Sequence, residues 1–303
     1  MIEQKHVYDY DIDLTSDTAP ARVIRMVRRG SKVLEIGAGP GSITRHLANT
    51  LGCDVDALEV DPSAIEILKS YGLNAYPGDL NNAGWSEEIA AKRGKFDFVI
   101  AADVLEHVID PWAVLAEMKS LLDDDGQIIL SIPHVGHAAV VACLLDEDFE
   151  YGPWGLLDRT HVRFFGIKNM QALINDAGLV IEEAEFVTRT PEMTEFVSHW
   201  ERIPSDIRSA IQRNRFSHVL QAVVRLRSAK GDERGIDLLS LTPSPPDQEA
   251  VEKWTRTMRR HAKSRTEVDT RSTFGATPVY GPKSSLSGKL HRLRKKLAKR
   301  FAK

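Results

Sequence analysis

The most informative hydrophobic pattern is a short apolar run that breaks into glycines and then resumes with helical spacing. Residues 33–36 are apolar apart from Glu35, glycines stand at alternate positions from Gly37 to Gly41, and apolar residues return with helical spacing at 43–48. This pattern predicts a buried strand, a tight turn and the start of a helix. Glycine suits such a turn because it accepts a positive φ and lets the backbone approach a ligand closely.

Further apolar stretches, separated by helical segments, predict a sheet. With the first run they give five strands without an internal repeat, which indicates an α/β, doubly wound (Rossmann-like), mostly parallel sheet. The five strands are expected at residues 33–36, 55–61, 74–76, 96–102 and 127–132. Residues 179–187 alternate as a sixth strand. A helix would fit 217–227, but we expect a seventh strand, antiparallel to the sixth at the sheet edge.

Acidic residues stand at or just beyond the ends of three expected strands. Glu35 lies two places before the first glycine of a G-x-G-x-G turn, which favours a cofactor with a charged amine over one with a pyrophosphate. Glu59 follows the turn by about twenty residues, the distance at which an acid accepts hydrogen bonds from ribose hydroxyls. Asp79 can accept a hydrogen bond from the exocyclic amine of a purine. These positions predict a nucleoside-type cofactor.

Composition and charge define the rest of the chain. The 303 residues are 42% hydrophobic, enough for one sizeable core with appendages. We expect an N-terminal helical segment at 1–30, a main domain at 31–230, a flexible linker at 231–285 and a basic amphipathic helix at 286–303. Eight Lys or Arg and no acid lie in 289–303, which leaves −11 on the remainder. The net negative charge of residues 1–288 argues against a protein that coats nucleic acid, whereas the basic helix is suited to binding an anionic membrane surface.

The N-terminus lacks the basic start and apolar stretch of a signal peptide, which predicts a cytoplasmic protein, peripheral on the inner membrane face if the basic helix attaches. Cys53 and Cys143 are isolated in apolar surroundings and are expected to be reduced. The sequence leaves the oligomeric state open. Residues 133–166 are too long for an ordinary connection and are rich in aromatic and titratable side chains, so we expect them to form a substrate lid.

Four motifs in order resemble the cofactor motifs of class I S-adenosylmethionine-dependent methyltransferases. They are Leu34–Gly41, Leu58–Pro62, Pro77–Asp79 and Ala102–His107. The resemblance implies that S-adenosylmethionine is the cofactor. It also implies roles for a set of residues along the carboxyl edge of the sheet, with Glu35 near the methionine ammonium, Glu59 on the ribose, Asp79 and Leu80 at the adenine, and Ala102 and Leu105 at the methionine end. The full implied set is Glu35, Gly37, Ala38, Gly39, Gly41, Glu59, Val60, Asp79, Leu80, Ala102, Asp103 and Leu105.

A narrower likeness concerns the acceptor. Ser131–Pro133 and Gly155–Phe165 resemble methyltransferases encoded among glycosyltransferases of bacterial surface-polysaccharide pathways, with His134 where that group often has Asn. This resemblance implies O-methylation of a sugar hydroxyl on a glycan or glycan precursor. The alternatives are a methyltransferase for a small aromatic or quinone-like metabolite, because 103–107 is shared with enzymes of quinone assembly, and an inactive cofactor-binding scaffold.

A sugar hydroxyl needs a base, and histidine suits that role because its ordinary pKa is about 6.5. We expect His161 to be the base, with Asp158 orienting its imidazole, and His134 as the second candidate. Asp103 and Glu106 are alternative bases, expected otherwise to be a cap and a solvated helix face.

Four further residues of the expected lid are predicted to contact the substrate. Arg159 can bind an anionic group such as a phosphate-linked sugar, and the rings of Tyr151 and Trp154 can stack on a sugar face. His137 is expected to lie beside them. His134, His137, Asp158 and His161 also allow an interpretation as a divalent metal site, but their spacing matches no strict ligand motif, so we assign no metal ligand.

Overall fold

The computed structural model describes residues 10–149, 151–246 and 251. All of them belong to one compact unit, 1–255. The predicted basic helix at 286–303 and, apart from residue 251, the part of the predicted linker from 247 to 285 lie outside the described residues. Among the residues described, no helix is long and apolar enough to cross a membrane.

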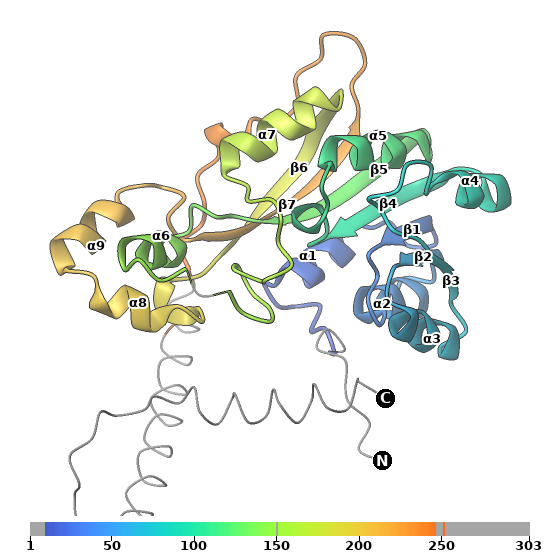
Figure 1. Ribbon diagram of the computed structural model, residues 1–303. Coiled ribbons are helices and arrows are strands. Elements are labelled where there is room, and N and C mark those ends of the chain that lie inside the picture. The colour runs from blue at the N-terminus through green and yellow to red at the C-terminus, as the bar shows by residue number, and fades with distance from the viewer. Residues whose placement is uncertain (1–9, 150, 247–250, 252–303) are drawn as a thin grey trace, which may run out of the picture. The chain divides into compact units, whose positions relative to one another are not determined.

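One seven-stranded sheet, with the order β3-β2-β1-β4-β5-β7-β6, organises the chain (Figure 1). The first five strands pair in parallel, and β7 is antiparallel to both β5 and β6. Their bounds are β1 Lys32–Ile36, β2 Asp54–Glu59, β3 Asn74–Pro77, β4 Phe96–Ala102, β5 Leu122–Pro133, β6 Leu179–Thr188 and β7 Val219–Ser228. The predicted α/β, doubly wound, seven-stranded and mostly parallel sheet is therefore confirmed.

The predicted place of the seventh strand is wrong in one respect. β7 lies between β5 and β6, so β6 rather than β7 forms the sheet edge. The side chains fit this order, because the middle of β6 carries Glu182, Glu183 and Glu185, the first of which is exposed, whereas no residue of β7 is exposed. A strand with charged side chains tolerates an edge better than an apolar strand, which would expose a row of unpaired backbone groups beside apolar surface.

Helices cover both faces of the sheet, as expected for parallel strands joined by helical crossovers. Two of them begin where the sequence places an acid before a proline, since Asp61 caps α3 and Asp110 caps α5. The helices are α1 Ala19–Arg25, α2 Ser42–Asn49, α3 Pro62–Ser70, α4 Glu87–Arg93, α5 Pro111–Ser120, α6 Ala138–Leu145, α7 Ile167–Asp176, α8 Val197–Arg202 and α9 Ser205–Gln212. Short 3₁₀ turns occur at η1 Leu105–His107, η2 Pro191–Met193 and η3 Leu238–Ser240.

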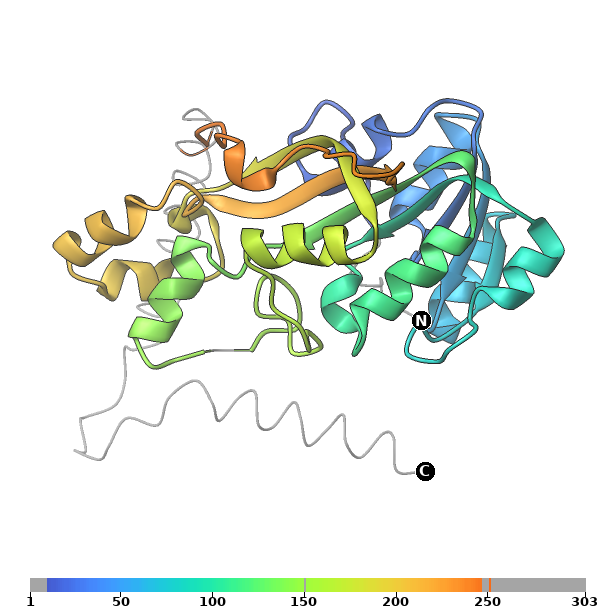
Figure 2. The ribbon, with the colours of Figure 1, turned by 90° about the horizontal axis from the view of Figure 1, so that it is seen from above.

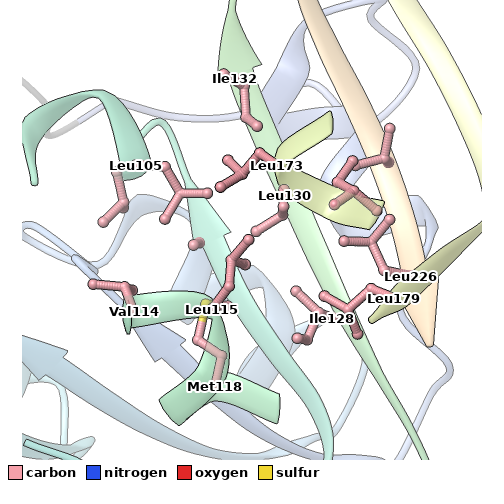
Figure 3. Packing of buried hydrophobic residues seen from close by; sticks show 14 of the residues in the cluster. Leu105, Val114, Leu115, Met118, Ile128, Leu130, Ile132, Leu173, Leu179 and Leu226 are labelled. Atoms are coloured by element: carbon pink, nitrogen blue, oxygen red, sulfur yellow. The ribbon is translucent and has the colours of Figure 1, made fainter. Parts of the chain in front are cut away.

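The two faces form separate hydrophobic cores. On one face α5 and α7 pack on β4, β5 and β6, with Leu115, Met118 and Leu173 fully or almost fully buried (Figure 3). On the opposite face α1 and α2 pack on β1, β4 and β5. Figure 2 shows α5 and α7 on the same side of the sheet. Because both faces are buried, the central strands are apolar throughout rather than alternating.

Part of the segment predicted as a substrate lid is structural. Residues 138–145 form α6, which packs against α8 and α9 at one end of the sheet (Figures 1 and 2). Ala138 and Ala142 are fully buried against Trp200 of α8. The remaining part, from 151 to 165, is irregular and approaches the carboxyl end of β4 through hydrogen bonds described below.

The folded part of the chain extends past residue 230, where we had placed the start of a flexible linker. Leu238 is fully buried, and its N–H donates to Oε1 of Gln171 on α7 at 2.8 Å. The N–H of Ile236 donates to the carbonyl of Ile181 on β6 at 2.8 Å. Residues 235–241 therefore cover the outer end of the sheet, which corrects the predicted linker boundary.

Candidate active site

The predicted glycine turn lies between β1 and α2 and has the expected backbone geometry. Gly37, Gly39 and Gly41 have φ values of +65°, +53° and +89°. A Cβ added to Gly37 would lie 2.6 Å from Cγ2 of Val104, in the segment after β4. The turn needs glycine for two reasons, since side chains other than glycine rarely adopt this φ and the space beside it is filled. Gly37 and Ala38 both donate their N–H to the carbonyl of Leu58, at 2.8 and 3.3 Å.

Glu59, at the end of β2, joins the glycine turn to the neighbouring strand. Its Oε2 accepts the N–H of Gly39 at 2.7 Å, while Oε1 accepts the N–H groups of Val60 at 2.8 Å and Asp61 at 2.9 Å. The side chain is buried, whereas that of Val60 is exposed. The sequence predicted the position of Glu59 but not these backbone contacts, which fix the carboxylate beside the turn.

Glu35 is a buried acid on β1 without a basic partner among its described contacts. Its Oε2 accepts a hydrogen bond from Oγ1 of Thr44 on α2 at 2.6 Å. Burial raises the pKa of Glu35 to about 8, the Thr44 bond works against that shift, and the nearby Glu59 adds to it. A cationic group placed beside this carboxyl would favour its ionised form. Thr44 was not found by sequence reasoning, although its place on the buried face of α2 is a signal.

Asp79 and Leu80 belong to the loop after β3, at the same carboxyl edge of the sheet as the glycine turn and Glu59. Asp79 is half-buried, and its Oδ1 accepts the N–H of Asn81 at 2.9 Å. Leu80 is partly buried and packs on the larger hydrophobic core. A Cβ on Gly78 would lie 2.5 Å from Cδ1 of Leu58, so this loop runs close to β2.

Asp103, directly after β4, ties three strand ends together. It has a φ of +54°, and its carboxylate accepts Oγ of Ser131 on β5 and Nε2 of Gln221 on β7, each at 2.8 Å. Burial raises the pKa of Asp103, against the effect of these bonds. The positive φ of a non-glycine residue is uncommon and costs free energy, which the three-strand network offsets. Gln221 escaped the sequence analysis because it sits within an apolar strand.

Tyr10 lies over the same edge. The N–H of Tyr10 donates to Oγ of Ser42, the first residue of α2, at 3.1 Å. Burial, together with the carboxylates of Asp103 and Glu35, raises the pKa of its hydroxyl to about 12. Tyr10, although 41% exposed, thus lies close to Ser42, Asp103 and Glu35, and Ala102 at the end of β4 is half-buried.

Three titratable side chains meet just after β4. Glu106 and His107 belong to η1, and the carbonyl of Glu106 accepts the N–H groups of Val162 and Arg163 at 2.9 and 3.0 Å, which brings His161 beside them. Nε2 of His161 lies 3.9 Å from Oε1 of Glu106, and the rings of His107 and His161 meet edge to face at 4.7 Å. The neighbouring Leu105 is fully buried.

Glu106 does not lie on a solvated helix face, as the sequence had suggested. It is 1% exposed, and burial raises its pKa well above the ordinary value. Burial, followed by the nearby His107, lowers the pKa of His161. Within the described part of the chain, neither carboxylate oxygen of Glu106 has a hydrogen-bond partner. A buried carboxyl without a partner is costly, and in native proteins it is explained by strain, an ordered water, a bound ion or a catalytic role.

Asp158 lies near enough to His161 for its charge to oppose the lowering of the imidazole pKa that burial causes, and the predicted orientation of His161 by Asp158 stays a prediction. Nδ1 of His161 lies 3.2 Å from the carbonyl of Leu156, whereas Oδ1 of Asp158 accepts the N–H and Oγ1 of Thr160 at 2.8 and 2.7 Å. Oγ1 of Thr160 lies 3.0 Å from Nδ1 of His107. Asp158 therefore acts on His107 through Thr160, a residue that sequence reasoning missed.

The structure corrects the predicted roles of His134 and His137. His134 is 4% exposed, and its Nδ1 lies 3.1 Å from the carbonyl of Val219, which suits a structural group better than a base. His137 is fully buried and caps α6, since its Nδ1 accepts the N–H of Ala139 at 3.2 Å and its Nε2 lies 3.0 Å from the carbonyl of Arg189. Both ring nitrogens of His137 thus have backbone partners, and its contact with a substrate stays a prediction.

The alternative metal set of His134, His137, Asp158 and His161 is also not assembled. Among the described residues, the one cluster of three such groups consists of Glu106, His107 and His161.

The other predicted substrate residues stand on the surface of the 151–165 segment. Tyr151 and Trp154 are each 53% exposed, and Arg159 is exposed with its Nε donating to the carbonyl of Gly152 at 3.3 Å. Phe149 packs edge to face on both Tyr151 and Phe164. Phe149, Tyr151 and Phe164 thus form an aromatic cluster that contacts His161 through Phe164, while Trp154 and Arg159 are exposed on the same segment.

The chain matches known proteins over this region. Residues 12–184, more than half of the chain, match the family described as "Methyltransferase domain". The ubiquinone biosynthesis O-methyltransferase of Xanthomonas euvesicatoria pv. vesicatoria is 28% identical over 170 residues, which cover 55% of this chain and 70% of the relative. The protein of the same name from Xanthomonas oryzae pv. oryzae is 29% identical over 126 residues, 41% of this chain and about half (52%) of that relative.

One of the solved structures to which the chain is similar has a lower sequence identity. The 1,6-didemethyltoxoflavin-N1-methyltransferase of Burkholderia thailandensis, with bound S-adenosylhomocysteine, is 17% identical, with a TM-score of 0.44 over 71% of this chain and 80% of that one. The family match covers the glycine turn, Glu59, Asp103 and the cluster after β4. The chain therefore belongs to the methyltransferase domain family and is an S-adenosylmethionine-dependent methyltransferase.

Proposed function

We propose that this enzyme transfers a methyl group from S-adenosylmethionine to a hydroxyl oxygen. The observation that carries the proposal is the cluster of Glu106, His107 and His161 directly beside the methionine-end motif 102–105. A hydroxyl must lose its proton before or during attack, and titratable groups at this place can assist that loss. This is the role we expected for His161, now shared with two neighbours.

The residues along the sheet edge fit the cofactor. Gly37 has no room for a side chain beside Val104, so the turn presents backbone only at this position, and Glu35 offers a buried carboxyl without a basic partner among the described residues. We propose that Glu35 lies near the methionine ammonium and Glu59 near the ribose, with Asp79 and Leu80 beside the adenine. When bound, the cofactor supplies an electrophilic sulfonium methyl group, and this chain contributes orientation and the exclusion of water.

For the acceptor we propose a sugar hydroxyl of a glycan or glycan precursor. The half-exposed rings of Tyr151 and Trp154 present apolar faces of the kind that stack on sugars, and the exposed Arg159 can pair with a phosphate carried by the sugar. All three residues stand on the segment that delivers His161 to the cluster. The proposal for these residues is thus the one made from the sequence.

A phenolic acceptor is the second candidate. Ubiquinone biosynthesis O-methyltransferases are among the curated relatives, and the same segment exposes Val162 (55%) and Phe164 (39%), which suit an apolar or prenylated molecule. The apolar side chains Ile109 and Trp112 are exposed in the segment that follows η1. Such a surface favours an acceptor with a large hydrophobic part.

Labelled cofactor distinguishes these acceptors. The full chain is incubated with methyl-labelled S-adenosylmethionine and with separate pools of sugar nucleotides, lipid-linked saccharides, polysaccharide and prenylated phenols. We expect label in a saccharide pool and its loss in His161→Ala. His199→Ala serves as the matched control and should keep turnover, because it removes a buried histidine of α8 that pairs with Asp146 at the end of α6. Label in the phenol pool supports the second candidate, and label on nitrogen or carbon contradicts both.

We also propose that residues 286–303 attach the enzyme to an anionic membrane face on the cytoplasmic side. The support is the composition of this segment, with eight cations and apolar residues at helical spacing. Deletion of 286–303 should abolish co-sedimentation with anionic vesicles and leave turnover on a soluble acceptor unchanged. Equal sedimentation of the shortened chain would contradict the attachment.

A further inference from the structure

The cluster after β4 has the composition of a metal site. One ligand atom from each of Glu106, His107 and His161 lies within 4.8 Å of the others. The side chains of Glu106 and His161 are 1% and 6% exposed. Two imidazoles and one carboxylate form a common three-residue set for divalent metal ions with open coordination positions.

The contacts of the His107 ring define which of its nitrogens carries the proton. Its Nδ1 lies 3.0 Å from Oγ1 of Thr160, and that hydroxyl donates its own hydrogen to Oδ1 of Asp158 at 2.7 Å. A hydroxyl that has donated its hydrogen can only accept from the ring, so His107 carries its proton on Nδ1. The lone pair of His107 is therefore on Nε2. A carboxylate that orients a histidine through such a contact is typical of the residues behind a metal ligand.

The contacts of the His161 ring define its protonated nitrogen in the same way. Its Nδ1 lies 3.2 Å from the carbonyl oxygen of Leu156, which can only accept, so the ring proton is again on Nδ1. The lone pair on Nε2 is directed to the side of Glu106, whose Oε1 lies 3.9 Å away. Two histidines from segments more than fifty residues apart thus have the same tautomer and leave the same nitrogen available.

A further observation is independent of the histidines. Glu106 is 1% exposed and, within the residues that the structure describes, both of its carboxylate oxygens lack a hydrogen-bond partner. Leaving such a group buried and unsatisfied costs about 1–3 kcal/mol or more, so it persists where a ligand satisfies it. The backbone carbonyl of the same residue, in contrast, accepts two N–H groups, from residues 162 and 163.

We propose that Glu106, His107 and His161 bind a divalent first-row transition metal ion, through the carboxylate and the two Nε2 atoms. The two imidazoles favour Zn²⁺, Mn²⁺ or Fe²⁺ over Mg²⁺ and Ca²⁺, which prefer oxygen ligands. Three protein ligands leave coordination positions for other oxygen atoms. Asp158 and Thr160 are positioning residues, since they act on the ion only through His107.

The metal site deepens the proposed function, and its catalytic part rests on that function. The open positions suit an acceptor with two adjacent oxygens, such as a vicinal diol of a sugar or a catechol. Coordination to a cation lowers the pKa of a hydroxyl. The O–H bond breaks and the proton passes to water, the oxygen forms a bond to the methyl carbon, and the C–S⁺ bond breaks so that its electron pair stays on a neutral thioether sulfur.

Metal binding is tested without turnover. The full chain is treated with a chelator, dialysed, and titrated separately with Zn²⁺ and Mn²⁺ by calorimetry. We expect one ion per chain in the wild type and at least tenfold weaker binding in Glu106→Gln and His161→Ala. His199→Ala, a buried histidine beside a carboxylate elsewhere in the fold, should bind like the wild type. Absence of stoichiometric binding, or equal binding in Glu106→Gln, would overturn the proposal.

A milder variant guards against misfolding. Thr160→Val keeps all three ligands and changes an exposed side chain, yet removes the acceptor for Nδ1 of His107. Loss of such a contact behind a ligand costs about 10–100-fold in metal affinity. We expect affinity to fall at least tenfold while the far-ultraviolet dichroism and melting temperature of the chelated protein stay unchanged. Unchanged affinity would contradict the assigned tautomer.

The failure of this proposal and the failure of the proposed function are distinguishable. If hydroxyl methylation persists in the presence of chelator and His161→Ala is inactive, the metal proposal is rejected and the role of His161 as a base is retained. Stoichiometric metal binding together with label on nitrogen or carbon keeps the site and rejects O-methylation. Activity that is lost in chelator and restored by one equivalent of Zn²⁺ or Mn²⁺ supports both.

Discussion

Replacing Glu35 by glutamine should change the proton balance of cofactor binding. Burial raises the pKa of Glu35 from 4.5 to about 8 in the ligand-free protein, a difference on the order of 5 kcal/mol in favour of the protonated form. At pH 7 roughly nine-tenths of the molecules carry that proton. An ammonium group bound beside Glu35 would ionise it, so binding of S-adenosylmethionine should release close to one proton at pH 7 and few at pH 9.

Calorimetry in buffers of different ionisation enthalpy measures that release. Glu35→Gln keeps an oxygen acceptor for Thr44 but has no proton to release, so the buffer dependence of its binding heat should be smaller by about one proton. The ligand-free proteins provide a second test. Because the folded pKa of this acid lies above its unfolded value, the wild type loses stability as the pH rises through 8, and the variant should lose less. Equal proton release in both proteins would refute the placement of the ammonium.

Three further predictions concern the frame of the site. Gly37→Ala places a Cβ 2.6 Å from Val104 at a φ of +65°, so it should lower cofactor affinity at least tenfold. The control Gly52→Ala has a φ of +67° but open space around it, and it should lower the free energy of unfolding in denaturant by only about 1 kcal/mol. Leu238→Ala should destabilise the protein by about 2–5 kcal/mol because the side chain is fully buried, and an unchanged melting temperature would restore the linker boundary at 230. Burial lowers the pKa of His137 to about 4, so the free energy of unfolding of the wild type should fall by about 2 kcal/mol between pH 7 and 5. His137→Asn keeps a cap for α6, and its free energy of unfolding should fall by correspondingly less while KM stays unchanged.

The hydrophobic pattern was sufficient to predict most of the sheet. Apolar runs and glycine or proline breaks are local signals, and they located the strands of the parallel sheet as well as the turn at Gly37–Gly41. They failed to order the last two strands, because antiparallel pairing of β7 with both β5 and β6 depends on contacts between segments far apart in the sequence. The burial of Leu238 was missed for the same reason, since the short apolar stretch around it packs on distant segments that the local sequence does not identify.

In the candidate site, too, some features follow from local spacing in the sequence and others from contacts between distant segments. The sequence by itself located Glu35, the glycine turn and Glu59 at the carboxyl edge of the sheet, because their spacing lies within one strand-turn-helix unit and its neighbour. Their contacts with the cofactor stay a prediction. Only the tertiary structure decided the chemistry after β4, where residue 161 reaches Glu106 and His107 across more than fifty residues, and where His134 and His137 turn away into the core. Spacing along a chain fixes what a single turn can do, but the partners of a side chain at a loop end depend on which distant segment packs there.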